Sequence, residues 1–146
     1  MSFKNTIPLI TATLLALGVQ QVVASESGFL TIEMQGIHNN DGQAIFILMD
    51  SESSHRGEAP IFTRRLETVN QQGTQVKFTD VPAGDYSAVI YHDLNANGKL
   101  DRNFFGKPTE PYGFSNNARN PFGIPDFDDS KFSVNARNAV QTIVVK

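Results

Sequence analysis

Residues 93–101, which read DLNANGKLD, carry oxygen-bearing side chains at a spacing that suits a hard metal ion. Counted from the first residue, these side chains occupy loop positions 1, 3, 5 and 9, as Asp93, Asn95, Asn97 and Asp101. Gly98 stands at position 6, where a calcium loop turns sharply, and Lys99 stands at position 7, where such a loop uses a backbone carbonyl. Calcium takes six to eight oxygens at about 2.3–2.6 Å. The spacing therefore predicts a calcium-binding loop.

The loop also departs from a complete calcium site, because its twelfth position is Phe104 where a bidentate Glu is usual. Only two carboxylates lie within the loop, so further ligands must come from elsewhere in the chain. Asn, Asp and Gly are also the common turn residues, whose side chains bond to their own backbone. A metal-free turn is therefore the alternative to calcium.

The elements that would position this loop are short strands separated by turns. Apolar or alternating runs occupy residues 28–35, 44–49, 61–69, 75–78, 86–91, 132–134 and 139–145. In the first run Leu30, Ile32 and Met34 share one face, as in a half-buried strand. The strand over residues 86–91 leads directly into the candidate metal loop. About seven strands without a helical period predict an all-β fold, an antiparallel β-sandwich.

Two connections between these strands differ in character. Residues 51–60 are polar, and we expect His55 and Arg56 to lie in a solvated loop. Residues 102–129 show no secondary-structure period, but they mix aromatic residues with Gly and Pro. Disordered segments are poor in aromatics, so we expect one long ordered loop that packs on its own rings and on the sheet.

The aromatic loop is the second candidate for function. Rigid rings among Gly, Asn and Ser offer contact area at low entropic cost, which suits a glycan or a peptide. We predict that Tyr112, Phe114 and Phe122 contact such a ligand. The alternative is that the rings form a small core beneath the loop.

Composition limits the classes of function. The 146 residues argue for one domain, and the net charge of -3 argues against nucleic acid as a partner. The absence of cysteine excludes disulfides and thiolate metal sites. Residues 1–24 have the layout of a secretory signal peptide, which leaves residues 25–146 as a single periplasmic or secreted domain without a membrane anchor. An uncleaved anchor is the alternative.

The motifs PAGDYS, YHDLNANGKLD and FFGKPTEPYGFSNN, with an FDDSKF end at residues 127–132, closely resemble a bacterial family known only as domain of unknown function 2141. The resemblance covers nearly all of residues 25–146. It implies a location in the cell envelope and no particular activity, because the family has none assigned. A more distant resemblance is to transthyretin-like and collagen-adhesin-B-like sandwich modules, in which a PxGxY turn such as residues 82–86 leads into a late strand.

Some of these sandwich modules carry a similar loop that ends in an acidic residue, which this chain lacks. A ligand would then have to fold back from Glu110, Asp126, Asp128 or Asp129. We predict Asp128 and Asp129, because the long loop must return to the sheet near them. The alternative is that these acidic residues are solvated.

Three functions follow as hypotheses. The first is an exported, non-enzymatic module that binds structural calcium and contacts an envelope protein or a glycan through residues 102–129. The second is a small periplasmic hydrolase that would use His92 and Asp93 with Ser115 or Glu110. Neighbouring strand residues point to opposite faces, which argues against a direct pair of His92 and Asp93. The third is a purely structural accessory of the envelope.

Overall fold

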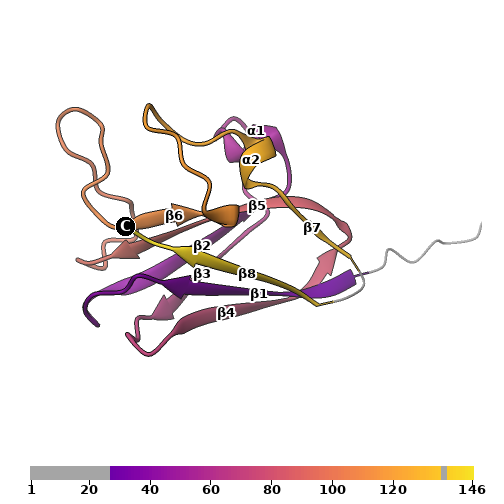
Figure 1. The fold of residues 1–146 in the computed structure, drawn as a ribbon, viewed down its shortest axis with the longest axis horizontal. Helices are drawn as coiled ribbons and strands as arrows, with labels where there is room; N and C mark the ends of the chain where they lie inside the picture. The colour runs from indigo at the N-terminus through magenta and orange to yellow at the C-terminus, as the bar shows by residue number, and fades with distance from the viewer. Residues whose placement is uncertain (1–26, 136–137) are drawn as a thin grey trace, which may run out of the picture.

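Two packed β-sheets make up the part of the protein that the computed structural model describes, residues 27–135 and 138–146 (Figure 1). The predicted signal peptide lies outside this part. One sheet has the strand order β4-β1-β8, and the other has the order β3-β2-β5-β6 with β7 also paired to β5. The elements are β1 (Ser27–Gln35), β2 (Gln43–Met49), α1 (Glu52–His55), β3 (Thr63–Thr68), β4 (Thr74–Pro82), β5 (Gly84–Asp93), β6 (Tyr112–Phe114), the 3-10 helix η1 (Ser115–Asn117), α2 (Phe127–Ser130), β7 (Phe132–Val134) and β8 (Ala139–Val144).

The arrangement confirms the predicted all-β sandwich. The strand pairings are antiparallel except that of β1 with β8, which is parallel and places Leu30 beside Ala139. The described residues form eight strands where about seven were expected, because β6 arises within residues 102–129.

The core lies between the two sheets and follows from the alternation of strand side chains. Leu30, Ile32 and Met34 of β1 are buried as predicted, and they face the core with Phe46 of β2 and Ile90 of β5. The same alternation turns a second set of apolar side chains of β2 and β5 toward the opposite face of the larger sheet.

The expectation of a solvated loop at residues 51–60 is wrong for His55. Ser51 caps the short helix α1 by accepting the backbone N–H of Ser54 at 3.2 Å. The helix turns the His55 ring inward, where only 6% of the residue is exposed. The ring packs against Phe114 and Phe127, with centroids 5.6 and 5.8 Å away. Polar flanking residues gave no indication of this burial.

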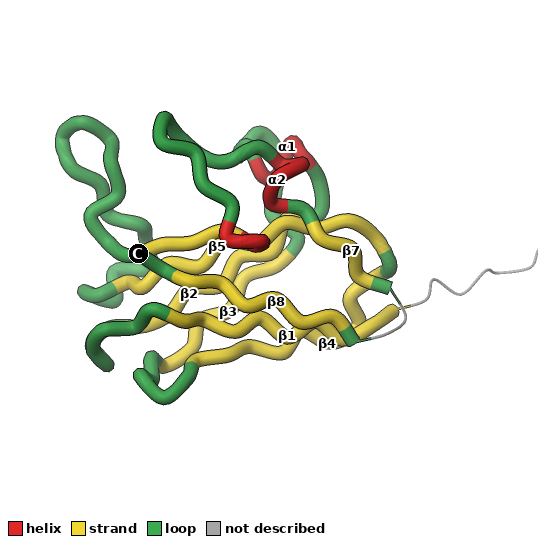
Figure 2. Tube along the Cα trace, viewed as in Figure 1, coloured by secondary structure: helices red, strands yellow, loops and turns green. Residues whose placement is uncertain are grey.

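Residues 102–129 are ordered, as expected, but they contain regular structure that the sequence pattern did not predict. β6 pairs with β5, η1 follows it directly, and α2 precedes β7. β6 escaped prediction because Pro111 precedes it and Gly113 lies at its centre, and both residue types are typical of loops. The segment divides into two projecting loops, residues 101–109 and 118–126, which stand side by side on the same side of the strands (Figure 2).

No helix in the described part of the chain is long and apolar enough to span a membrane. Its two α-helices have four residues each.

Candidate functional site

The main concavity of the candidate site, which we call the aromatic cleft, lies over the outer face of the larger sheet. Its volume is about 800 Å³. Side chains of β2, β5 and β6, including Ile47, Val89 and Tyr112, form the floor. The first wall consists of residues 100–108, and the second wall consists of residues 120–124. These walls belong to the two projecting loops.

The floor exists because the central strands are apolar on both faces. In β2 the core-facing Phe46 lies between Ile45 and Ile47, which face outward, and in β5 the core-facing Ile90 lies between Val89 and Tyr91. An antiparallel sheet with a solvated face would alternate apolar with polar residues. An outer face of this composition needs a cover, and the two loops cover it only in part.

The first wall is a hairpin that continues from the candidate metal loop. The amide of Thr109 donates to the carbonyl of Asp101 at 2.9 Å, and the amide of Asn103 donates to the carbonyl of Lys107 at 2.9 Å. The Asn103 side chain accepts the amides of Phe105 and Lys107 and so fixes the tip. Phe104 at this tip is 98% exposed and Phe105 is 88% exposed.

The second wall is held to the sheet by His55. One ring nitrogen, Nε2, lies 2.8 Å from the carbonyl oxygen of Pro125, and the other, Nδ1, lies 2.8 Å from the Ser87 hydroxyl on β5. The Asn120 side chain closes the turn by accepting the amide of Phe122 and donating to the carbonyl of Ile124. The Phe122 ring at the tip remains 96% exposed.

All three predicted ligand-contacting rings line the aromatic cleft. Tyr112 and Phe114 lie on its floor, with ring centroids 6.2 Å apart, and Phe122 stands at the mouth. The alternative of a small core beneath the loop holds for Phe114, which is buried, but Phe105 and Phe122 are exposed rings. The aromatic segment therefore has both packed rings and free rings.

The candidate metal loop is ordered by hydrogen bonds around Asp93. This side chain is fully buried at the end of β5, which is a central strand of its sheet. Its Oδ1 accepts the amide of Asn97 at 3.0 Å, and its Oδ2 accepts the amide of Gly98 at 2.7 Å and the Gln43 side chain at 2.8 Å. Burial by itself would raise the pKa of Asp93, but the bonds from Gln43, Gly98, Asn97 and Ala96 outweigh it and lower the pKa.

The other loop side chains converge on Asp101. Asn95 donates through Nδ2 to its Oδ2 at 2.7 Å, and Asn97 donates to both carboxylate oxygens at 3.0 and 3.1 Å. The Oδ1 atom of Asn97 accepts the amide of Lys99. The predicted metal ligands Asn95, Asn97 and Asp101 are thus adjacent. The two Asn side chains turn their N–H groups, and not their oxygens, toward the Asp101 carboxylate.

Glu110, and not Asp128 or Asp129, is the acidic residue that folds back to this loop. Its Oε1 accepts the amide of Leu94 at 2.9 Å, and its Oε2 accepts the amide of Asp101 at 3.0 Å. The Asp128 carboxylate instead pairs with Lys131 at 2.7 Å within α2 and its C-cap, and Asp129 lies in the same helix. The chain returns to the loop of residues 93–101 just before β6, and α2, which carries the predicted Asp128 and Asp129, follows later. Nowhere in the described part do three or more His, Asp or Glu side chains form a metal-binding group.

Tyr91 joins the metal loop to the cleft floor. Its hydroxyl donates to the carbonyl of Gly98 at 3.3 Å. Burial raises the pKa of Tyr91, and Asp93 and Glu110 raise it as well, while Arg64 opposes them. The hydroxyl therefore stays protonated and able to donate near neutral pH.

The side chains named for a hydrolase make separate contacts. His92 Nε2 lies 2.7 Å from the carbonyl oxygen of Asp41. The Ser115 hydroxyl accepts the amide of Ala88 and donates to the carbonyl of Ser130, and the Glu110 carboxylate is taken up by backbone amides. No hydrogen bond connects these side chains as an acid–base–nucleophile arrangement would require.

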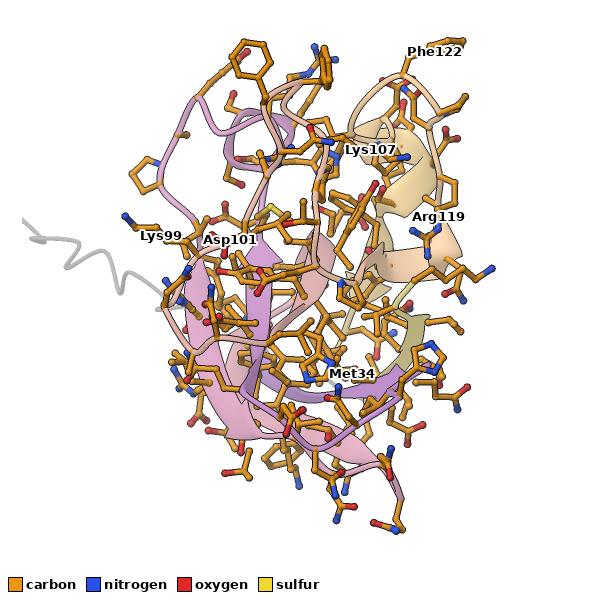
Figure 3. All side chains as sticks on the ribbon, turned by 90° about the vertical axis from the view of Figure 1, so that its left-hand side faces the viewer. Met34, Lys99, Asp101, Lys107, Arg119 and Phe122 are labelled. Carbon is orange, nitrogen blue, oxygen red and sulfur yellow. The ribbon has the colours of Figure 1, made fainter. Side chains whose placement is uncertain are left out.

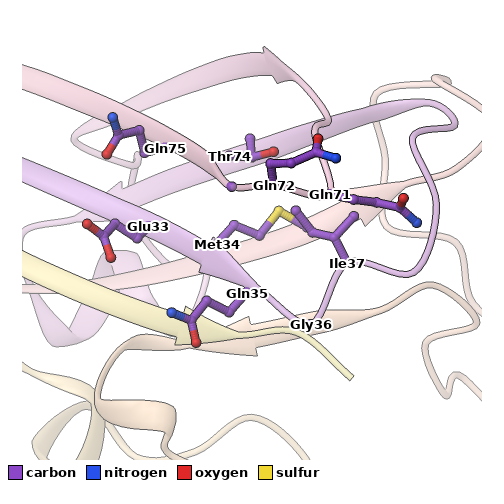
Figure 4. Close-up of a pocket in the computed structure, with 10 residues that line it drawn as sticks. Glu33, Met34, Gln35, Gly36, Ile37, Gln71, Gln72, Thr74 and Gln75 are labelled. Carbon is purple, nitrogen blue, oxygen red and sulfur yellow. The ribbon is translucent and has the colours of Figure 1, made fainter.

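A second concavity of about 470 Å³ lies where β1 ends near the turn between β3 and β4 (Figure 4). Its lining is dominated by polar side chains, among them Gln35, Gln71, Gln72 and Gln75. Gln71 is committed to contacts within the protein, since its side chain donates to the carbonyl of His38. The aromatic cleft has the larger volume and contains every ring predicted to contact a ligand.

The cleft also includes residues that the sequence did not suggest as functional, namely His55, Arg102 and Lys107. Arg102 and Lys107 flank the aromatic pair Phe104 and Phe105 in the sequence. This combination of basic and aromatic residues was the signal that could have identified them as functional. His55 had no local indication, because its partners Ser87 and Pro125 are 32 and 70 residues away.

Comparison with known protein families identifies a related family. A family model described as an uncharacterized protein conserved in bacteria (DUF2141) matches residues 32–142. No curated protein and no solved structure matches the chain. The predicted likeness to transthyretin-like modules therefore stays a prediction.

Proposed function

We propose that this chain, which belongs to the DUF2141 family of uncharacterised bacterial proteins, is an exported, non-enzymatic module that binds a ligand in its aromatic cleft. The observation that supports this most directly is that Tyr112, Phe114 and Phe122 line one cleft of about 800 Å³. Ligand sites commonly have volumes of about 300–1,000 Å³ and a mainly apolar lining with a few polar groups.

Exposed rings at the mouth supply a driving force for binding. Phe105 and Phe122 are 88% and 96% exposed, and both line the cleft. Fully covering one such side chain is worth up to about 1.5–3 kcal/mol. A ligand with an apolar body would cover these rings and also fill the space above Ile47 and Val89.

Export remains part of the proposal because it depends on the layout of residues 1–24. In a periplasm or outside the cell, the ligand would come from the envelope or its surroundings. A glycan or a segment of an envelope protein could use the rings as well, but the apolar floor favours a ligand that has an apolar part.

A cleft-filling substitution tests the proposal. N-phenyl-1-naphthylamine is a neutral apolar dye that fluoresces when it leaves water, and we expect it to bind the protein saturably. Val89→Phe adds a ring on the floor and should abolish this binding. Val140→Phe makes the same change on β8, where the side chain is 59% exposed, and should leave binding intact. Absence of dye binding to the unaltered protein, or equal binding by Val89→Phe, would refute the cleft as a ligand site.

Structural calcium in the loop of residues 93–101 is a second proposal, supported by the convergence of Asn95 and Asn97 on Asp101. Rotating the two amides would turn their oxygens toward the carboxylate, an arrangement that a bound cation would stabilise. The buried Asp93 and the nearby Glu110 would add negative charge. Leu100 and Arg102 line the cleft, so an ion here would also order the first wall.

Thermal unfolding with calcium tests this second proposal. Calcium at millimolar concentration should raise the melting temperature by mass action, and EDTA should reverse the rise. Asp101→Asn should remove most of the shift, whereas Asp128→Asn, which alters an exposed ion pair on α2, should retain it. Equal melting temperatures with calcium and with EDTA would overturn the proposal.

A further inference from the structure

We infer that the ligand of the aromatic cleft is an anionic amphiphile, a single apolar chain that ends in a carboxylate or phosphate group. The inference rests on the proposed function, and it adds the chemical class of the ligand.

The walls of the cleft are positively charged on a protein whose net charge is -3. Arg102 and Lys107 line the cleft, and no Asp or Glu among the described residues does. The guanidinium of Arg119 lies 5.7 Å from the centroid of the Tyr112 ring and adds a third cation at the edge of the floor. Charge complementarity therefore favours a negatively charged ligand.

None of these three cations pairs with a carboxylate among the described residues. The ion pairs found there are Arg56–Glu52 and Lys131–Asp128. Arg102 donates to the carbonyl of Gly106, and Arg119 donates to two other backbone carbonyls. The Lys107 ammonium makes no hydrogen bond or ion pair within the part that the structure describes.

The acidic residues that flank the first wall, Asp101 and Glu110, already accept hydrogen bonds from other groups of the protein. Both oxygens of Glu110 accept backbone amides, and the Asp101 carboxylate accepts the side chains of Asn95 and Asn97. These bonds direct the carboxylates into the loop of residues 93–101 and away from the cleft. The cations of the walls are thus left for an external anion.

The position of the charges indicates how such a ligand would lie. The floor residues Ile47, Val89 and Phe114 are apolar, whereas Arg102 and Lys107 belong to the exposed first wall. Lys107 and Phe122 lie toward the same end of the molecule, away from Met34 (Figure 3). A chain on the floor with its charged group at the mouth would avoid the cost of burying that charge.

A monomeric amphiphile fits this geometry better than a bilayer surface. The floor is recessed below the tips that carry Phe105 and Phe122, so a flat membrane would contact the tips and leave Val89 uncovered. An extended chain can reach the floor. We therefore assign the site to a free amphiphile and treat membrane binding as an outcome that would contradict the assignment.

Calorimetric titration with three twelve-carbon probes below their micellar concentrations tests the inference. Dodecanoate should bind roughly threefold to tenfold more tightly than dodecanol, as expected for one charge-assisted contact at a partly exposed site. Dodecyltrimethylammonium should bind most weakly. Equal affinities for the acid and the alcohol would overturn the inference while leaving the cleft as an apolar ligand site. No binding of any probe, together with no binding of the neutral dye, would overturn both.

A matched pair of lysine variants locates the charge contact. Lys107→Gln should remove most of the preference for dodecanoate over dodecanol, whereas Lys77→Gln, on the exposed surface of β4, should keep it. The Lys107 side chain has no hydrogen-bond or ion-pair partner among the residues that the structure describes, so its replacement should not disturb folding. Flotation with phosphatidylglycerol vesicles completes the test. Co-flotation without binding of free dodecanoate would overturn the assignment to a monomeric ligand.

Discussion

The Glu110 carboxylate accepts the backbone N–H of Asp101 at 3.0 Å while its other oxygen accepts the N–H of Leu94 at 2.9 Å. One buried side chain therefore joins both ends of the oxygen-lined loop. The carbonyl of Asp101 also accepts the amide of Thr109, at the base of the first wall of the cleft. Glu110 thus couples the order of the candidate metal loop to the position of a cleft wall.

Replacing Glu110 with Gln should destabilise the protein by about 1–3 kcal/mol, because the amide NH₂ would face a backbone N–H that loses its acceptor. Urea denaturation should report the loss as a lower midpoint without a change in slope. Glu58→Gln, at an exposed position whose side chain has no partner in the described part of the chain, provides the control and should stay within about 0.5 kcal/mol. Matching midpoints for the two variants would contradict the coupling role of Glu110.

Replacing His55 with Ala should release the second wall, because the ring contacts the Pro125 carbonyl and the Ser87 hydroxyl at once. We expect faster amide hydrogen exchange across residues 119–126, with the strands of the smaller sheet unchanged. His38→Ala, at an exposed position before β2, is the matched control. Unaltered exchange in residues 119–126 would show that other contacts hold the wall.

The sandwich could be predicted from sequence because most of its strands are apolar or alternating runs bounded by turn residues. The inward set of Leu30, Ile32 and Met34 follows from alternation alone, and the structure confirms it. The proximity of Asn95, Asn97 and Asp101 could also be predicted, since their spacing in one short loop brings the three side chains together. These features depend on neighbours within a few residues.

The remaining features depend on distant partners and so left no local pattern. The ring of His55 is buried by Phe114 and Phe127, which come from the far end of the chain. Glu110 meets the metal loop only because β6 returns beside β5 after a hairpin, and Pro111 and Gly113 make the sequence of β6 look like a loop. A single sequence therefore indicated the aromatic segment but not the cleft that it forms.

Gly113 on β6 should tolerate no larger residue, since a Cβ atom there would lie 2.6 Å from the Val144 carbonyl oxygen and 2.8 Å from Ile143 Cγ2. β6 meets β8 at this point, so the two sheets would have to separate slightly. We expect Gly113→Ala to cost about 1–3 kcal/mol of stability, measured by chemical denaturation. Gly123→Ala, whose Cβ would meet nothing within 4 Å, is the control. Similar stability of the two variants would contradict this close packing.

Lowering the pH should remove the part of the free energy of unfolding that the ionised Asp93 carboxylate contributes. Burial opposes its ionisation, yet the hydrogen bonds from Gln43 and the loop amides lower its pKa below 3.8, the value for an unperturbed Asp. A lowered folded-state pKa means that the unfolded chain binds the proton more readily. The stabilisation is then fully present above about 3.8 and is lost as the pH falls through the lower folded value.

Asp93→Asn should therefore be less stable than the unaltered protein near pH 7, and the difference should shrink below about pH 4 as the carboxylate is protonated. Gln43→Met removes one of the bonds that lower the pKa, and it should weaken this pH dependence without abolishing it. Urea denaturation at a series of pH values between about 7 and 3 measures the difference directly. A constant difference across the series would mean that the loop does not depend on the charge of Asp93.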